Sequence, residues 1–111
     1  METITYDDFA RLDIRIGRIL AAEMVPETDK LIKCTIDFGA ELGQRTIVSG
    51  IALYVSPESL VGRRLPYIVN LAPRMLRGIE SQGMLLALSY GDDLFSFLAP
   101  EKEVPEGTKI K

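Results

Sequence analysis

Apolar and polar residues alternate along several short stretches of the chain, which predicts β-strands with one buried face. The clearest stretch is 32–38, where every second residue is apolar. A similar alternation begins at Leu12 and slips at Gly17, and a glycine at a change of register predicts a β-bulge. Further strands are expected at 45–49, 65–71, 84–90 and 94–98, with a last short one near 109–110.

Capping and turn residues separate these stretches. The segment Thr5-Tyr6-Asp7-Asp8 has the form of a capping box, which predicts a short helix over about 6–11 with Phe9 facing inward. The segment Ser56-Pro57-Glu58 supplies an N-cap, a proline in the first turn and an acidic residue, so a second short helix is expected to about Val61. Turns are expected at 26–29, 39–43 and 91–93.

These elements indicate an all-β protein of one domain. The 111 residues contain no repeat, linker or low-complexity segment. Short strands with one helix predict a small β-barrel or sandwich. A helix between the third and fourth strands matches the five-stranded Greek-key barrel of the OB-fold. We expect a barrel core over about 12–90, with a short N-terminal extension and a C-terminal extension over about 91–111.

Composition argues against catalysis and against a membrane protein. The chain has no histidine and one cysteine, so histidine-based acid–base chemistry, an internal disulfide and an ordinary zinc site are all excluded. We expect no catalytic residue, metal or cofactor, and a buried Cys34. The single cysteine fits the reducing cytoplasm, no apolar run is long enough for a membrane helix, and the acidic N-terminus does not resemble a signal peptide.

Charge is unevenly distributed along the chain. The net charge is −3, yet 60–81 holds four arginines against one glutamate, whereas 91–107 is strongly acidic. On charge alone both stretches are also consistent with ordinary solvated surface. The polar stretch 70–84 lies between two apolar strands, and its Arg74 and Arg77 are suited to phosphate. Lys30 and Lys33 fit either phosphate binding or protection of a sheet edge.

The sequence resembles the tRNA-binding domain found at the C-terminus of many methionyl-tRNA synthetases, as a standalone dimeric protein, and as a module of some eukaryotic synthetases and their partners. The matching segments cover nearly the whole chain in order, at 8–17, 29–31, 45–51, 54, 57–58, 60–62, 70–74 and 78–84.

The resemblance implies an OB barrel that recognises the shape of tRNA near its elbow without reading an anticodon. It also implies a homodimer when the domain stands alone, in which residues after the barrel help to form the interface, and we expect 94–110 to be part of that interface. One difference is that the family often has lysine where Ala72 stands, so one phosphate contact is expected to be missing. The RNA contacts carried onto this sequence are Asn70, Arg74, Arg77, Ser81, Met84, Lys30, Lys33 and Arg45.

Two other functions stay open at this point. A related family of dimeric OB proteins acts in secretion as chaperone-like factors that bind unfolded peptides. An accessory subunit that docks on an aminoacyl-tRNA synthetase is the second alternative. An exposed apolar groove favours peptide binding, whereas basic residues that converge on one face favour RNA.

Overall fold

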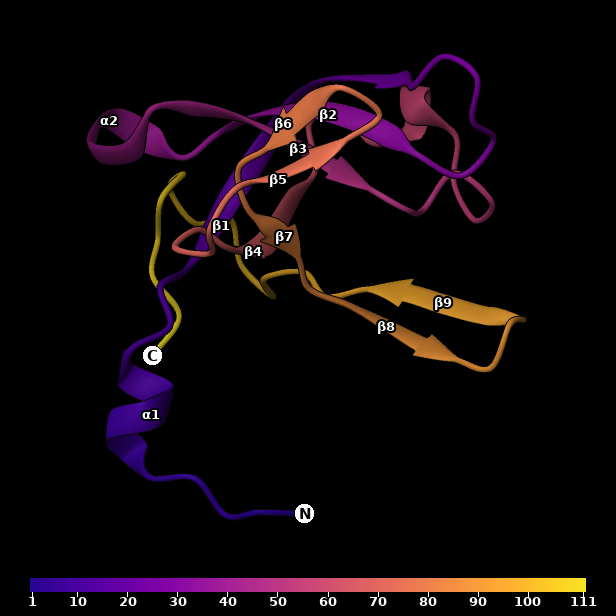
Figure 1. The fold of residues 1–111 in the computed structure, drawn as a ribbon. Helices are drawn as coiled ribbons and strands as arrows, with labels where there is room; N and C mark the ends of the chain where they lie inside the picture. Colours follow the sequence, from indigo (N-terminus) through magenta and orange to yellow (C-terminus); the bar gives the residue numbers. More distant parts are fainter.

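The computed structural model describes all 111 residues, and its main feature is a strongly curled antiparallel sheet of five strands (Figure 1). The strand order β3-β2-β1-β4-β7, with a helical turn between β3 and β4, confirms the OB-fold prediction. The five strands are β1 (Ile14–Met24), β2 (Ile32–Asp37), β3 (Gln44–Ser49), β4 (Arg64–Ile68) and β7 (Met84–Leu85).

The core lies inside the curled sheet, where alternate side chains of each strand point inward. Ile32, Ile36 and Ile47 have no exposed surface, and Cys34 is buried among them as predicted. The Phe38 and Tyr67 rings meet edge to face with their centroids 5.5 Å apart. Each such apolar side chain contributes roughly 1.5–3 kcal/mol of burial free energy. The period-two pattern of the sequence is therefore what closes the barrel.

Strand β1 is long enough to pair with both β2 and β4 because it contains a bulge. The register between β1 and β2 shifts between Ile19 and Ala21, so the predicted bulge exists but does not lie at Gly17. A Cβ atom at Gly17 would lie 2.6 Å from the Phe38 ring. The glycine is therefore required for close packing of the core and not for the change of register.

The helices are shorter than predicted. Helix α1 (Tyr6–Ala10) begins at the predicted capping box, in which Thr5 Oγ1 accepts from Asp8 N and the Asp8 carboxylate accepts from Thr5 N. The inward placement of Phe9 is wrong, because α1 extends away from the barrel and Phe9 is only half-buried against Tyr6 (Figure 1). No helix is long or apolar enough to cross a membrane.

Two other local predictions are corrected. The segment expected as a turn after β2 forms the single-turn helix α2 (Gly39–Leu42). The helix expected from Ser56 is only a 3-10 turn over Pro57–Ser59, and the Ser56 side chain makes no capping bond. Leu60, the residue after this turn, is fully buried in the core and so fixes the turn to the barrel.

The predicted strand 84–90 is divided between two sheets. Strand β7 stays in the barrel, whereas β8 (Ala87–Tyr90) pairs with β9 (Leu94–Phe97) in a hairpin that projects to one side (Figure 1). Leu86 N still donates to Pro66 O, but proline has no N–H to donate back. The ladder between β4 and β7 therefore ends at this residue pair.

The polar stretch between β4 and β7 contains a second hairpin, made of β5 (Arg74–Leu76) and β6 (Ile79–Ser81). Beyond β9 the tail returns across β1, where Gly107 N donates to Ile16 O and Ile110 N donates to Ile14 O. The predicted last strand is thus present only as an isolated bridge between Arg15 and Lys109.

Candidate nucleic-acid interface

The outer face of β2 and β3 carries polar side chains beside one apolar residue. Cys34 and its partner Ile47 point into the core, so the flanking pairs Lys33–Val48 and Thr35–Thr46 point outward. In OB barrels the face formed by strands 2 and 3, with the loops between strands 1 and 2 and between strands 4 and 5, binds oligonucleotides. These loops are 25–31 and 69–83 in this chain.

The β5–β6 hairpin lies across β3 and closes its free edge (Figure 1). Ser81 Oγ accepts from Val48 N at 2.9 Å, and Gln82 Oε1 accepts from Thr46 N at 3.0 Å. Gln82 N donates to Thr46 O at 2.9 Å. Two side chains therefore replace the strand partner that β3 lacks. Ser81 is only 4% exposed as a result.

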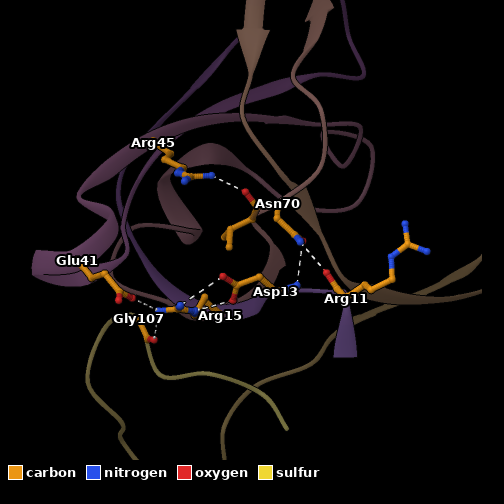
Figure 2. Close-up of polar contacts among 8 residues, drawn as sticks. Arg11, Asp13, Arg15, Glu41, Arg45, Asn70 and Gly107 are labelled. Carbon is orange, nitrogen blue, oxygen red and sulfur yellow. Dashed lines mark hydrogen bonds and ion pairs between the residues drawn. The ribbon is translucent and has the colours of Figure 1, made fainter. Parts of the chain in front are cut away.

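Arg45 and Asn70 hold the base of the same loop. The Arg45 guanidinium donates to the carbonyls of Val69 and Gln82, one at each end of the loop. Asn70 donates to Arg11 O at 2.7 Å and accepts from Asp13 N at 2.8 Å (Figure 2). We call Arg45, Asn70 and Ser81 the loop anchors, because the side chain of each binds backbone groups that fix the loop to the barrel.

The remaining predicted site residues surround the outer face. Arg74 and Arg77 are exposed on the hairpin, and neither side chain makes a hydrogen bond or ion pair. Lys33 lies opposite Val48 and forms an ion pair with Glu23 at 3.2 Å. The guanidinium groups of Arg74 and Arg77 are therefore exposed. The ion pair of Lys33 with Glu23 lies at the surface, where screening by salt keeps it weak.

Lys30 lies in the loop just before β2, close in sequence to Lys33. Its carbonyl accepts from Ala52 N, and the neighbouring residue Ile51 borders a hollow of about 180 Å³ together with Arg74 and Met84. We call this the smaller hollow. Arg74 and Met84 of the loop after β4 thus meet the end of β3 at this hollow, and Lys30 is joined to the same segment only through its backbone carbonyl.

A larger hollow of about 350 Å³ lies on the other side of Arg74 and Met84. Val48 forms its floor, Ala72 and Pro73 line it, and Met84 is 46% exposed beside them. The sequence analysis did not identify Val48, because alternation places it on the solvent side of β3. It is 6% exposed only because the hairpin covers it.

The tip of the hairpin has an unusual backbone conformation. Arg77 and Gly78 form a two-residue turn with φ of 52° and 80°, which matches the type I′ turn of tight hairpins. Such turns favour Asn or Gly at both positions, and the left-handed region costs other residues roughly 1–2 kcal/mol. An arginine is therefore held at the outermost point of the loop in spite of its conformational cost.

A polar cluster around Arg15 adjoins the Asn70 anchor through Asp13 (Figure 2). Arg15 donates to Asp13 at 2.6 Å, to Glu41 at 2.7 Å and to Gly107 O at 3.3 Å (Figure 2). Hydrogen bonds to Asp13 and then Glu41 raise the pKa of Arg15. This cluster fastens α2 and the C-terminal tail to β1. The chain contains no group of three residues suited to hold a metal ion.

An apolar groove of about 460 Å³ runs along β1 and β4, bordered by Ile14, Ile16, Pro66, Leu86 and Leu98. It continues onto one face of the β8–β9 hairpin, because Leu88, Tyr90 and Leu94 alternate in step with Leu86 and Leu98. These three are 52%, 81% and 60% exposed. The opposite face is covered, since Phe95 stacks on Tyr54 at 4.7 Å.

The strand order and the curled sheet define the class of the molecule, an OB-fold module. Residues 14–109 match the family described as "Putative tRNA binding domain". The chain belongs to this tRNA-binding domain family.

Individual relatives agree with this membership. A methionine–tRNA ligase of Parabacteroides distasonis is 49% identical over 110 residues, which are 99% of this chain and 16% of that protein. This chain therefore spans about a sixth of such relatives. The crystal structure of a MetRS related protein from Pyrococcus horikoshii has a TM-score of 0.92 at 39% identity, with 100% of both chains covered. The chaperone CsaA from Bacillus anthracis has a TM-score of 0.89 at 34% identity, with 99% of this chain and 100% of that chain covered.

Proposed function

We propose that this chain is a non-catalytic tRNA-binding module that recognises the shape and backbone of tRNA near its elbow. The observation that supports the proposal is the position of three cationic residues near Val48 on β3. Lys33 pairs with Val48, Arg74 borders both hollows that Val48 lines, and Arg77 lies at the tip of the same hairpin, on a chain whose net charge is −3. We expect Lys30 to add to this charge. Basic residues gathered on one face of an acidic protein are typical of binding to a polyanion.

The proposed mechanism separates contact residues from positioning residues. The arginines bind phosphate with planar, multi-donor heads, and the lysines add positive charge at the end of the face near the loop after β1. The loop anchors act indirectly, because Arg45, Asn70 and Ser81 already bind backbone groups. A loop that is fixed before binding loses less conformational entropy when RNA arrives. Ala72, where the family often has lysine, lines the larger hollow without adding a charge to that of Arg74.

A filter-binding titration with unfractionated tRNA at several salt concentrations tests the proposal. Each lost phosphate contact reduces the slope of log affinity against log salt by about 0.7–0.9, so Arg74→Ala/Arg77→Ala is expected to reduce it by about 1.5. The control Lys102→Ala/Lys111→Ala removes the same charge from exposed side chains that make no hydrogen bond or ion pair and do not adjoin the loop. Its slope should change by less than half as much. Equal losses in both variants would refute the assigned face, and absence of tRNA binding by the folded wild type would refute the function.

We also propose that the apolar groove and the hairpin face that continues from it are covered by a second copy of the chain. Monomeric proteins rarely expose a continuous apolar face of this kind. A homodimer would present two cationic faces to one tRNA and raise the effective concentration of the second contact. Sedimentation equilibrium is expected to give the mass of a dimer for the wild type and of a monomer for Leu88→Glu/Leu94→Glu. A monomeric wild type at micromolar concentration would contradict this.

Peptide binding is the second candidate, supported by the apolar groove and by the likeness to the chaperone CsaA. A fluorescent apolar peptide that binds the wild type, and not the groove variant Leu86→Glu, would favour it. An accessory role beside an aminoacyl-tRNA synthetase in the cytoplasm accords with the methionine–tRNA ligase relatives. Copurification of a synthetase with the tagged chain, retained after nuclease treatment, would support that role.

A further inference from the structure

The larger hollow and the smaller hollow beside it differ in charge from the other hollows on the surface. Arg74 is the only charged side chain on either border, and neither border has a carboxylate. The floor and most of the walls of the larger hollow are apolar. The hollow beside Lys33 includes Glu23, the one beside Arg64 includes Glu101 and Glu103, and the groove along β1 and β4 has no charged residue. Because the larger hollow is bordered by an arginine and by no carboxylate, it suits a flat apolar group that is attached to an anionic chain.

The size and walls of the hollow fit a single ring system. Pockets that take small molecules occupy roughly 300–1,000 Å³, and the 350 Å³ hollow lies at the lower end of that range. Met84 and Pro73 offer soft, flat surfaces, and the planar guanidinium of Arg74 can stack on a base. Proteins that recognise unpaired RNA stack bases on arginine planes as well as on aromatic rings.

The surroundings of the hollow are suited to the rest of a nucleotide chain. Arg74 and Met84 also border the smaller hollow, so the two hollows adjoin each other on either side of these side chains. We call the two together the depression. Lys33 lies opposite Val48, the floor of both hollows, and Arg77 lies at the tip of the hairpin above them. Cationic heads therefore stand on two sides of the depression, where phosphates that flank an inserted base would pass.

We propose that the larger hollow accepts one unstacked base of the bound RNA, with the Arg74 guanidinium and Met84 packed against the ring. The proposal rests on the proposed RNA-binding function and adds to it the chemical group that the hollow holds. It assigns part of the affinity to stacking on Met84 and on the flat face of the Arg74 guanidinium, while the N–H groups at the edge of the guanidinium stay available to phosphate. That part should persist at high salt and should require an unpaired base.

Filling the hollow separates this contact from phosphate binding. Ala72 is exposed and lines the larger hollow without bordering the smaller one, so Ala72→Phe occupies the space and leaves Arg74 and Arg77 in place. Ala40→Phe, at an exposed alanine of α2, is the matched control, and Ala72→Leu is a smaller filling variant. Thermal melting of all three variants checks that they fold.

The probe is an RNA stem-loop with 2-aminopurine in its unpaired loop, and a fully paired RNA duplex of equal length is the comparison. Wild type and Ala40→Phe should change the 2-aminopurine fluorescence on binding. Ala72→Phe should abolish that change and weaken stem-loop binding on the order of tenfold, which lies in the range that one stacked base contributes. Its salt slope and its affinity for the duplex should equal those of the wild type.

The outcomes distinguish this inference from the function on which it rests. Unchanged stem-loop affinity and fluorescence in both filling variants would overturn the base-binding assignment, even where Arg74→Ala/Arg77→Ala still weakens tRNA binding. Failure of the wild type to bind either tRNA or the stem-loop would overturn the function as well. Loss of apolar-peptide binding in Ala72→Phe, with RNA binding intact, would assign the hollow to peptides and overturn the proposal.

Discussion

Replacing Ser81 by alanine tests whether this residue is an RNA contact or a structural anchor. The hydroxyl is 4% exposed and accepts from Val48 N at 2.9 Å. Ser81→Ala therefore leaves a buried backbone N–H without a partner, which costs about 1–3 kcal/mol. For a domain of this size each 1 kcal/mol lowers the thermal midpoint by about 4–8 °C, so a fall of at least 4 °C is expected.

The same variant makes a second prediction about RNA binding. Because the hydroxyl faces β3, its loss should weaken tRNA binding only by loosening the hairpin, and the salt slope should stay within about 0.3 of the wild-type value because no phosphate contact is removed. Differential scanning calorimetry and filter binding measure the two quantities. Ser56→Ala is the control, since Ser56 is exposed and makes no capping bond. An unchanged melting midpoint together with a large loss of affinity would refute the anchor assignment and make Ser81 a direct contact.

Three other perturbations test the fold and the cationic face. Gly17→Ala should lower the free energy of unfolding by about 1–3 kcal/mol, because its Cβ would lie 2.6 Å from the Phe38 ring, whereas Gly50→Ala, with 4.0 Å of clearance, should be nearly neutral in urea titrations. Burial raises the pKa of the Cys34 thiol to about 11, so the unfolded chain ionises first and stability should fall between pH 9 and 11 by up to about 1.4 kcal/mol per pH unit. Comparison of wild type with Cys34→Ala at pH 7 and pH 10.5 isolates this loss, and equal pH dependence in both proteins would contradict it. Arg77→Asn should raise the free energy of unfolding by about 1 kcal/mol, because asparagine tolerates a φ of 52°, and should reduce the tRNA salt slope by about 0.9.

The sequence predicts the barrel well because its strands are specified by local alternation. The stretch 32–38 reads as one half-buried strand and folds as β2 with the expected side inward. The division of 84–90 could not be predicted in this way, because it depends on Pro66 in a different strand. Gly17 likewise looks like a local irregularity, and only contact with Phe38 across the sheet explains it.

The candidate site residues were selected from the sequence by residue type, which does not distinguish RNA contacts from structural anchors. Serine, asparagine and arginine in a polar loop have the same donors and acceptors whether they bind RNA or backbone. The backbone groups that bind Arg45, Ser81 and Asn70 lie 24, 33 and 57 residues from these anchors along the chain, so only the fold brings them together. Residue type therefore identified the loop, and three-dimensional partners divided its members into anchors and exposed side chains.

This division also explains why the hairpin can carry strain at its tip. Ser81 and Gln82 hold one strand of the hairpin to β3, and Arg45 holds both ends of the loop through backbone carbonyls. A hairpin fixed in this way keeps Arg77 at positive φ, where an unsupported loop would relax to a more favourable conformation. The anchors thus fix the hairpin to the barrel, and under the proposed function this would hold the Arg77 side chain in position before RNA binds. If that reasoning is correct, removing an anchor and removing Arg77 should not have additive effects on tRNA affinity, because both act through the same hairpin.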